Sequence, residues 1–340
     1  MSNTLIAAQL YTVREFCKTA GDLAETFRKL RQIGYQSVQI SGIGPIDPAA
    51  VRQALKDHQL TCCITHIGLD DMRNNPQAVI NKHRMWDCQY TAIGGYWPQG
   101  EYTRASWQGF ADEYNHLATT FAAAGLKIGY HNHSHELAKV DGTTPMQILV
   151  DTLKPPAFLE IDTYWITHGG GDPIEWIGKC AGRLPCLHLK DMAITPNREQ
   201  KMAAVGEGNL NMPGIIAAAT RAGTRWFIVE QDDCYGADPF ECLATSYRNL
   251  RAMGLEGMID NSKQFKGAWI RSRFMSWNDS ESVRSIPPLA ITCVSAQSPS
   301  PKTPLPRAGD CGWGGVGARE QKGGRGGLPH FGRHVASVKG

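Results

Sequence analysis

The chain has 340 residues, of which 42% are hydrophobic and 20% are charged, and this is the composition of a soluble globular protein with a large core. No apolar run is long enough to cross a bilayer, and the start of the sequence lacks the basic and apolar segments of a signal peptide. We therefore expect a cytoplasmic protein with no membrane contact. The ten cysteines form no C-x-x-C pair, which favours reduced thiols over a disulfide framework.

Charge divides the chain into two unlike parts. From residue 261 onward there are 12 Lys and Arg against 4 Asp and Glu, which leaves 23 against 28 in the preceding part. The mildly acidic body argues against a surface for duplex DNA, so nucleic acid is not an expected partner. The basic part also holds 12 Gly and 7 Pro and shows neither helical nor strand periodicity. We predict one folded domain over residues 1–256 and a low-complexity, disordered tail over residues 257–340.

Strand and helix patterns alternate along the body. Short, mostly apolar strand patterns occur at residues 5–13, 37–40, 61–68, 90–97, 127–133, 157–165, 185–191 and 226–232. Each is followed by a helical pattern, at residues 22–33, 47–58, 76–87, 106–125, 144–153, 172–180, 212–222 and 238–253. Eight such units over about 250 residues predict an α/β fold, the (β/α)8 or TIM barrel. An open doubly wound sheet is the alternative, but no glycine-rich phosphate loop follows the first strand.

Metal-binding side chains stand at the ends of consecutive predicted strands, where a barrel of this kind carries its functional groups. They are His131 with Glu136 shortly after it, Asp162, His188 and Glu230. A single buried acid would more often be a capping or salt-bridged residue. Several charged groups at one mouth need a partner, because charges are rarely buried unless they are paired or coordinate a metal. The set therefore predicts a shared cation.

These motifs resemble the sugar phosphate isomerase/epimerase superfamily, the xylose-isomerase-like TIM barrels. The resemblance covers residues 5–255 and rests on the segments QLYTVR (9–14), GYQSVQ (34–39), TH (65–66), YHNH with a following Glu (130–136), DTYW (162–165), HLKD (188–191) and VE (229–230). The resemblance is specific for the superfamily and says little about the substrate.

The resemblance implies a bound divalent ion, Mn²⁺, Mg²⁺, Co²⁺ or Zn²⁺. Asp162, His188 and Glu230 match three of its ligand positions. We take Glu136 as the remaining ligand, with His131 as the alternative because it stands where many relatives carry Glu. The resemblance also suggests contacts with the substrate from His66, His131, His133, Trp165 and Lys190.

The implied activity is that of a metal-dependent isomerase or epimerase acting on a sugar or sugar-like hydroxy-ketone. The metal would stabilise an enediolate while the catalytic carboxylates, Glu136 and Glu230, take and return the proton. The alternative is a lyase of the inosose or 3-keto-glycoside dehydratase type, which begins with the same proton abstraction. An endonuclease IV-like repair enzyme and a non-catalytic sugar-binding barrel are less favoured, because the body is acidic and the ligand set is complete. We expect a small carbohydrate substrate and leave assembly into a homo-oligomer open.

Overall fold

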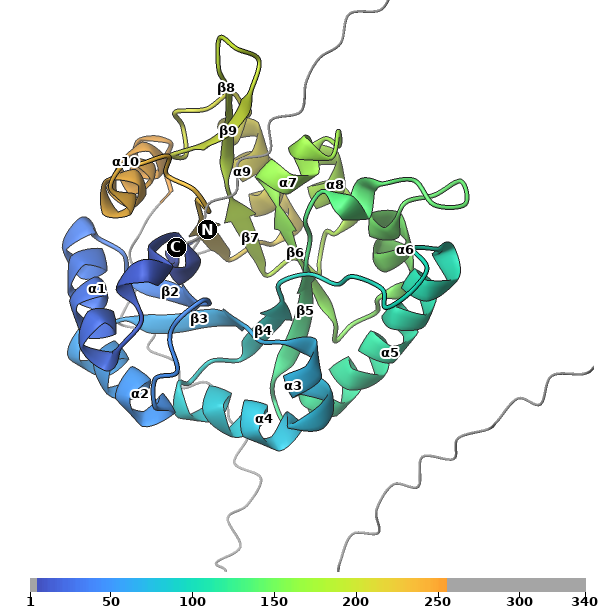
Figure 1. The fold of residues 1–340 in the computed structure, drawn as a ribbon, viewed down its shortest axis with the longest axis horizontal. Helices are drawn as coiled ribbons and strands as arrows, with labels where there is room; N and C mark the ends of the chain where they lie inside the picture. The colour runs from blue at the N-terminus through green and yellow to red at the C-terminus, as the bar shows by residue number, and fades with distance from the viewer. Residues whose placement is uncertain (1–4, 256–340) are drawn as a thin grey trace, which may run out of the picture. The chain divides into compact units, whose positions relative to one another are not determined.

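A closed barrel of parallel strands forms the centre of the protein. The computed structural model describes residues 5–255, so the prediction of a disordered tail at 257–340 lies outside the described residues. The strands follow one another around the ring in the order β1, β10, β7, β6, β5, β4, β3, β2. Figure 1 shows the helices arranged around the outside of these strands. The predicted (β/α)8 barrel is confirmed.

The barrel strands are short and almost entirely buried. They are β1 (Leu5–Gln9), β2 (Ser37–Ile40), β3 (Thr61–His66), β4 (Tyr90–Ile93), β5 (Lys127–His131), β6 (Phe158–Asp162), β7 (Cys186–Leu189) and β10 (Trp226–Val229). Strands buried on both faces are expected where helices cover a parallel sheet. Their register aligns the functional ends: Asp162 pairs with His188 across β6 and β7.

Seven of the eight main helices that the structure describes begin at a residue whose side chain accepts a backbone hydrogen bond, and the helix Pro76–Met85 is the exception. The eight helices are α1 (Ala20–Ile33), α2 (Pro48–Asp57), α4 (Pro76–Met85), α5 (Arg104–Ala123), α6 (Pro145–Thr152), α8 (Pro173–Lys179), α9 (Met212–Ala222) and α10 (Pro239–Ala252). Thr19 and Asp22 form a reciprocal capping box at the start of α1. At α2 and α10, Asp47 and Asp238 accept backbone hydrogen bonds ahead of a proline in the first turn.

Several short elements were not predicted. They are η1 (Leu10–Phe16), α3 (Leu69–Asn74), η2 (His135–Leu137), α7 (Thr163–His168), β8 (Asp191–Ile194) and β9 (Gln200–Ala203). The strand predicted to run to residue 165 is wrong at its end, because the Asp162 side chain accepts a hydrogen bond from Trp165 N and caps α7. The first strand likewise ends at Gln9, whose side chain caps η1.

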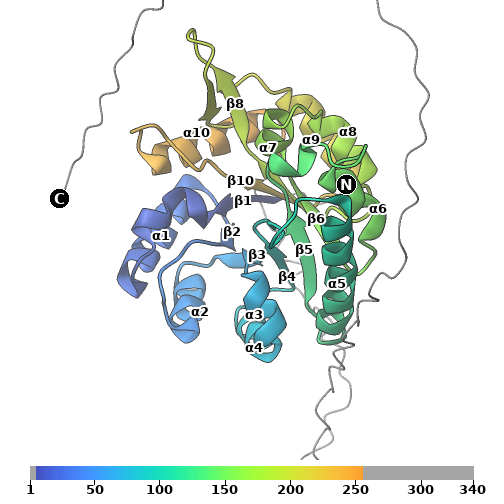
Figure 2. The same cartoon turned by 45° about the vertical axis from the view of Figure 1, so that its right-hand side comes forward.

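An antiparallel hairpin of β8 and β9 is inserted between β7 and α9, and Figure 2 shows it projecting from the barrel. Asp191 anchors its base. The Asp191 carboxylate accepts hydrogen bonds of 2.8 to 3.2 Å from the backbone N–H groups of Met192, Gly206, Gly208 and Leu210. A Cβ atom on Gly208 would come within 2.4 Å of Asp191 Oδ1, so this close approach requires glycine. Asp191 therefore has a structural role.

The described residues contain neither a membrane-spanning helix nor a disulfide. No helix between residues 5 and 255 is long and apolar enough to cross a membrane. The eight cysteines in this part of the chain are free thiols, and six of them are buried. They pack as small apolar residues in and around the barrel.

Candidate metal centre and active site

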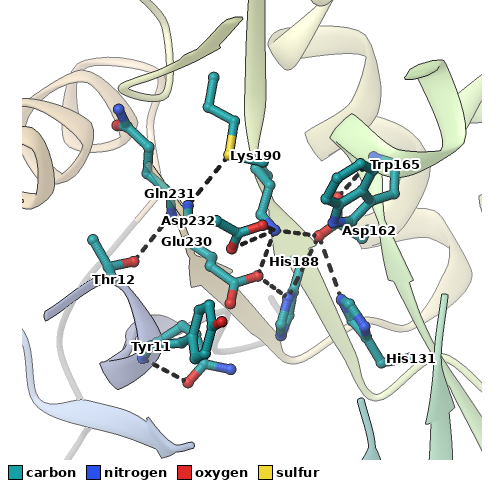
Figure 3. Close-up of polar contacts among 12 residues, drawn as sticks. Tyr11, Thr12, His131, Asp162, Trp165, His188, Lys190, Glu230, Gln231 and Asp232 are labelled. Atoms are coloured by element: carbon teal, nitrogen blue, oxygen red, sulfur yellow. Dashed lines mark hydrogen bonds and ion pairs between the residues drawn. The ribbon is translucent and has the colours of Figure 1, made fainter. Parts of the chain in front are cut away.

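Four side chains from four strands converge at the C-terminal mouth of the barrel. His131 ends β5, Asp162 ends β6, His188 lies in β7 and Glu230 directly follows β10. One nitrogen or oxygen atom from each lies within 4.8 Å of the others, and Figure 3 shows the side chains pointing toward one another. All four are at most 5% exposed. The structure thus brings together three of the four predicted ligands and adds His131.

The spacing within this group is that of a compact polar cluster. His188 Nδ1 lies 2.8 Å from Glu230 Oε2 and 3.7 Å from Asp162 Oδ2. His131 Nε2 lies 3.4 Å from the same Asp162 oxygen. Burial by itself would raise the pKa values of Asp162 and Glu230, but the adjacent Lys190 ammonium and the histidines hold both below their usual range. Both carboxylates are therefore ionised at neutral pH.

The group fits a divalent metal ion by its chemistry. It offers two ionised carboxylates and two imidazoles, a mixed oxygen and nitrogen donor set that suits Mn²⁺, Co²⁺ or Zn²⁺ better than Mg²⁺. His131 also has a buried ring nitrogen, Nδ1, without a hydrogen-bond partner. Buried polar atoms are nearly always satisfied, so an unpartnered one in such a cluster is typical of a functional site.

Lys190 supplies a buried positive charge beside the group. Its Nζ atom lies 3.1 Å from Asp162 Oδ2, 2.8 Å from Glu230 Oε2 and 2.9 Å from Asp232 Oδ1 (Figure 3). Burial would lower the pKa of Lys190, but the three carboxylates raise it well above its usual value. The ammonium offsets the repulsion among the acids.

A cavity of about 460 Å³ opens above the group. Its lining residues are Tyr11, Arg14, Ser41, His66, Ile67, Gly68, Gly94, Trp97, His131, His133, Lys190, Glu230 and Asp232. Of the predicted substrate contacts, His66, His131, His133 and Lys190 are in this wall. Trp165 is not; its ring packs against the ring of His133, with centroids 5.3 Å apart, and lies 5.5 Å from Lys190 Nζ.

Glu136, predicted as a metal ligand and as a catalytic carboxylate, does not join the four-residue group. Its carboxylate accepts hydrogen bonds from Tyr130 Oη at 2.7 Å and from the His133 backbone N–H at 2.9 Å. It is fully buried outside the cavity wall, and burial raises its pKa to about 7. Glu136 lies in the turn η2 and outside the four-residue group. His131, the alternative ligand, belongs to the group instead.

Two further acids belong to the site and were missed. Glu160 lies in β6 beneath Asp162, and Asp232 follows Glu230 at the cavity wall. Each is two residues from a predicted ligand, and side chains two apart in a strand point to the same face. That periodicity indicates Glu160, which shares β6 with Asp162, but not Asp232, because β10 ends at Val229.

Side chains that could hold a metal ion, at the C-terminal mouth of a closed parallel barrel, define the class of (β/α)8 proteins with a candidate metal centre. The model of the xylose isomerase-like TIM barrel family matches residues 27–252. The chain belongs to this family, as its motifs predicted.

Curated relatives of the chain include inosose dehydratases. That of Bacillus anthracis is 30% identical over 159 residues, which cover 41% of this chain and 52% of the relative. That of Geobacillus kaustophilus is 23% identical over 191 residues, covering 49% of this chain and 61% of the relative. The chain therefore spans about half the length of the curated relatives it matches.

Solved structures show the same barrel. A sugar phosphate isomerase/epimerase from Parabacteroides distasonis has a TM-score of 0.63 at 21% identity, covering 75% of this chain and 96% of that one. An L-ribulose 3-epimerase has a TM-score of 0.55 at 17% identity, covering 74% and 94%. At these identities the likeness shows the fold alone.

Metal affinity distinguishes His131 from Glu136 as the first ligand. We expect His131→Ala to weaken binding of Mn²⁺ by at least about 10-fold, because it removes one of four donor groups. Glu136→Gln should change the affinity by less than about threefold, because it keeps the shape of a side chain outside the group. Isothermal titration calorimetry measures both; the opposite order of effects would restore Glu136 as the ligand.

Proposed function

We propose that the chain is a metal-dependent lyase that removes the proton beside the carbonyl of a polyhydroxy ketone and then expels a β-hydroxyl group as water. The support is the combination of an ionised Glu230 on one side of the cavity with imidazoles on the other. The inosose dehydratases among the relatives agree with this choice. A divalent ion held by the four-residue group would supply positive charge to stabilise the developing enediolate.

Glu230 is the proposed base. It lines the cavity at the end of β10 and is ionised, because Lys190 and His188 outweigh the effect of burial on its pKa. It would take the proton from the carbon beside the carbonyl. The electron pair left on that carbon then forms the new double bond as the β-hydroxyl leaves, so the reaction needs no oxidant or reductant.

Imidazoles, not carboxylates, face this base. Among the described residues of the cavity wall, the only carboxylates are Glu230 and Asp232, both at the end of β10. His66 and His131 end β3 and β5, each three strands away from β10 around the ring. A histidine there can protonate the leaving hydroxyl when it carries a proton on the nitrogen that faces the cavity, and we assign this role to the protonated form of His66. The arrangement replaces the pair of carboxylates predicted from the sequence.

The charges in the wall favour a neutral sugar or cyclitol over a phosphate ester. Arg14 donates hydrogen bonds to the backbone carbonyls of Tyr11 and Asp232, at 2.8 and 3.0 Å. Lys190 is paired with three carboxylates. In the described part of the chain, no other Lys or Arg lines the cavity. A phosphate group would therefore meet one cation with free N–H groups, Arg14, next to the acids Glu230 and Asp232 in the same wall.

An isomerase or epimerase is the second candidate. It shares the first step, and the opposite imidazole would return the proton to carbon instead of to the leaving oxygen. The product distinguishes the two: the lyase releases water, whereas the isomerase or epimerase conserves the mass of the substrate.

The test is a screen of the metal-loaded protein in D₂O. Neutral ketoses, inososes, 3-keto glycosides and the matching sugar phosphates are incubated and followed by NMR and mass spectrometry. We expect deuterium uptake beside the carbonyl and loss of one water from a neutral substrate. Exchange with conserved mass would identify the second candidate, and no exchange with any ketone would refute the proposed function.

A further inference from the structure

We infer that Glu160 is a positioning residue beneath the candidate site, whose buried carboxylate fixes the ring orientation and the proton position of both His188 and His66. The consequence for His188 rests on the metal centre of the proposed function. The consequence for His66 stands on hydrogen-bond geometry alone, so the two can be tested separately.

Glu160 connects three other strands inside the barrel. It lies in β6 and is completely buried. Its Oε2 atom accepts hydrogen bonds from His66 Nε2 of β3 at 2.7 Å and from Gln39 Nε2 of β2 at 3.3 Å. Its Oε1 atom lies 3.2 Å from His188 Nε2 of β7, an ionic contact without hydrogen-bond alignment. One carboxylate thus contacts both histidines.

The orientation of Gln39 transmits this contact to His188. An ionised carboxylate only accepts hydrogen bonds, so Gln39 must turn its NH₂ group toward Glu160. The Gln39 Oε1 atom then faces His188 Nε2 at 2.7 Å, and because this oxygen also only accepts, the hydrogen lies on His188 Nε2. His188 Nδ1 points to Glu230 and Asp162 and donates a hydrogen to Glu230 in the metal-free protein; with Nε2 held by Gln39, Nδ1 is the nitrogen that would lose its hydrogen to bind a metal.

The same hydrogen-bond argument fixes the position of the proton on the His66 ring. Its Nε2 atom must carry the hydrogen that is donated to Glu160, which leaves Nδ1 of the neutral ring as an acceptor. A Cβ atom on Gly94 would lie 3.3 Å from His66 Nδ1, and Gly94 and His66 both line the cavity. His66 Nδ1 therefore faces the place of a substrate hydroxyl, so the proton that His66 would pass to the leaving hydroxyl must first bind at Nδ1.

The negative charge of Glu160 also favours metal binding. Three N–H groups face its carboxylate, from His66, Gln39 and His188, and such donors favour the ionised form of a buried acid. An anion enclosed in the barrel beneath the four ligands adds to the attraction for a cation above them. Removing that charge and its hydrogen bonds should weaken metal binding without removing a ligand.

Metal affinity tests the consequence for His188. Glu160→Gln keeps the shape of the side chain, and Glu136→Gln is a matched control because Glu136 is equally buried and hydrogen-bonded outside the group. In calorimetric titrations with Mn²⁺ we expect 10- to 100-fold weaker binding in Glu160→Gln, the usual effect of removing a residue that orients a ligand, and less than threefold change in the control. Unchanged affinity would overturn the inference. So would a fall from two bound ions to one, since Glu160 would then be a ligand.

The tautomer of His66 is tested in the metal-free protein by NMR of ¹⁵N-labelled histidine. We expect the proton on Nε2 in the wild type and a shift toward Nδ1 in Glu160→Gln, with no change in Glu136→Gln. If Glu160→Gln fails to fold, Gln39→Leu replaces it, with weaker metal binding and an unchanged His66 expected. Unchanged tautomers and metal affinities in Glu160→Gln would refute the positioning role and leave the proposed function standing. A wild type that binds metal but exchanges no proton beside any ketone carbonyl would refute the proposed function and leave the positioning role standing.

Discussion

Glu230→Gln should lower the rate of deuterium exchange beside the substrate carbonyl by about 10²- to 10⁴-fold, the usual contribution of a general base. The amide keeps the volume of the side chain but cannot take a proton. Glu230 lies 2.8 Å from both His188 Nδ1 and Lys190 Nζ, so the substitution also removes one carboxylate from the metal group. Rates are therefore compared at saturating Mn²⁺, with NMR as the measurement.

The control for this variant is Glu241→Gln in the first turn of α10. Glu241 is exposed, and its substitution makes the same change of charge outside the site. It should leave the exchange rate unchanged. Circular dichroism checks that both variants are folded. A Glu230→Gln protein that exchanges at the wild-type rate would remove Glu230 as the base.

Lys190→Met should destabilise the metal-free protein by about 3 to 5 kcal/mol, the cost of leaving a buried charge without its partner. The ammonium is 1% exposed and contacts Asp162, Glu230 and Asp232. Without it these carboxylates repel one another in a poorly solvated interior. A divalent ion bound beside two of them should restore part of the loss, so the variant should gain more stability from Mn²⁺ than the wild type does.

Urea denaturation with and without Mn²⁺ measures this effect. Lys179→Met is the matched control, because Lys179 forms an ion pair with Glu175 at 2.8 Å on the surface of α8. Exposed pairs contribute at most about 1 kcal/mol, so this variant should remain close to the wild type. Equal and small losses in the two variants would show that Lys190 does not balance the acids.

The barrel was predictable because each strand and helix carries its own local signal. The patterns at residues 37–40 and 61–68, for example, match β2 and β3 within two residues. The hairpin of β8 and β9 was not predictable in this way. Its strands are four residues each and largely lack alternation between apolar and polar residues, and their stability depends on the remote hydrogen bonds of Asp191.

The site was predictable where a ligand ends a strand, as for Asp162 and Glu230, because strand direction alone brings such ends together. Glu136, predicted as a ligand, lies outside the four-residue group, because it follows the end of β5 and its position depends on the turn η2. The number of residues between a strand end and a loop residue does not tell where the side chain of that residue points. The three contacts of Lys190 likewise depend on the register of neighbouring strands.

The most direct measurement for the whole account is an anomalous difference map of a crystal grown with Mn²⁺. The account predicts one strong peak per chain, within bonding distance of His131, Asp162, His188 and Glu230. A peak bound by Glu136, or no peak among these four side chains at saturating Mn²⁺, would contradict it.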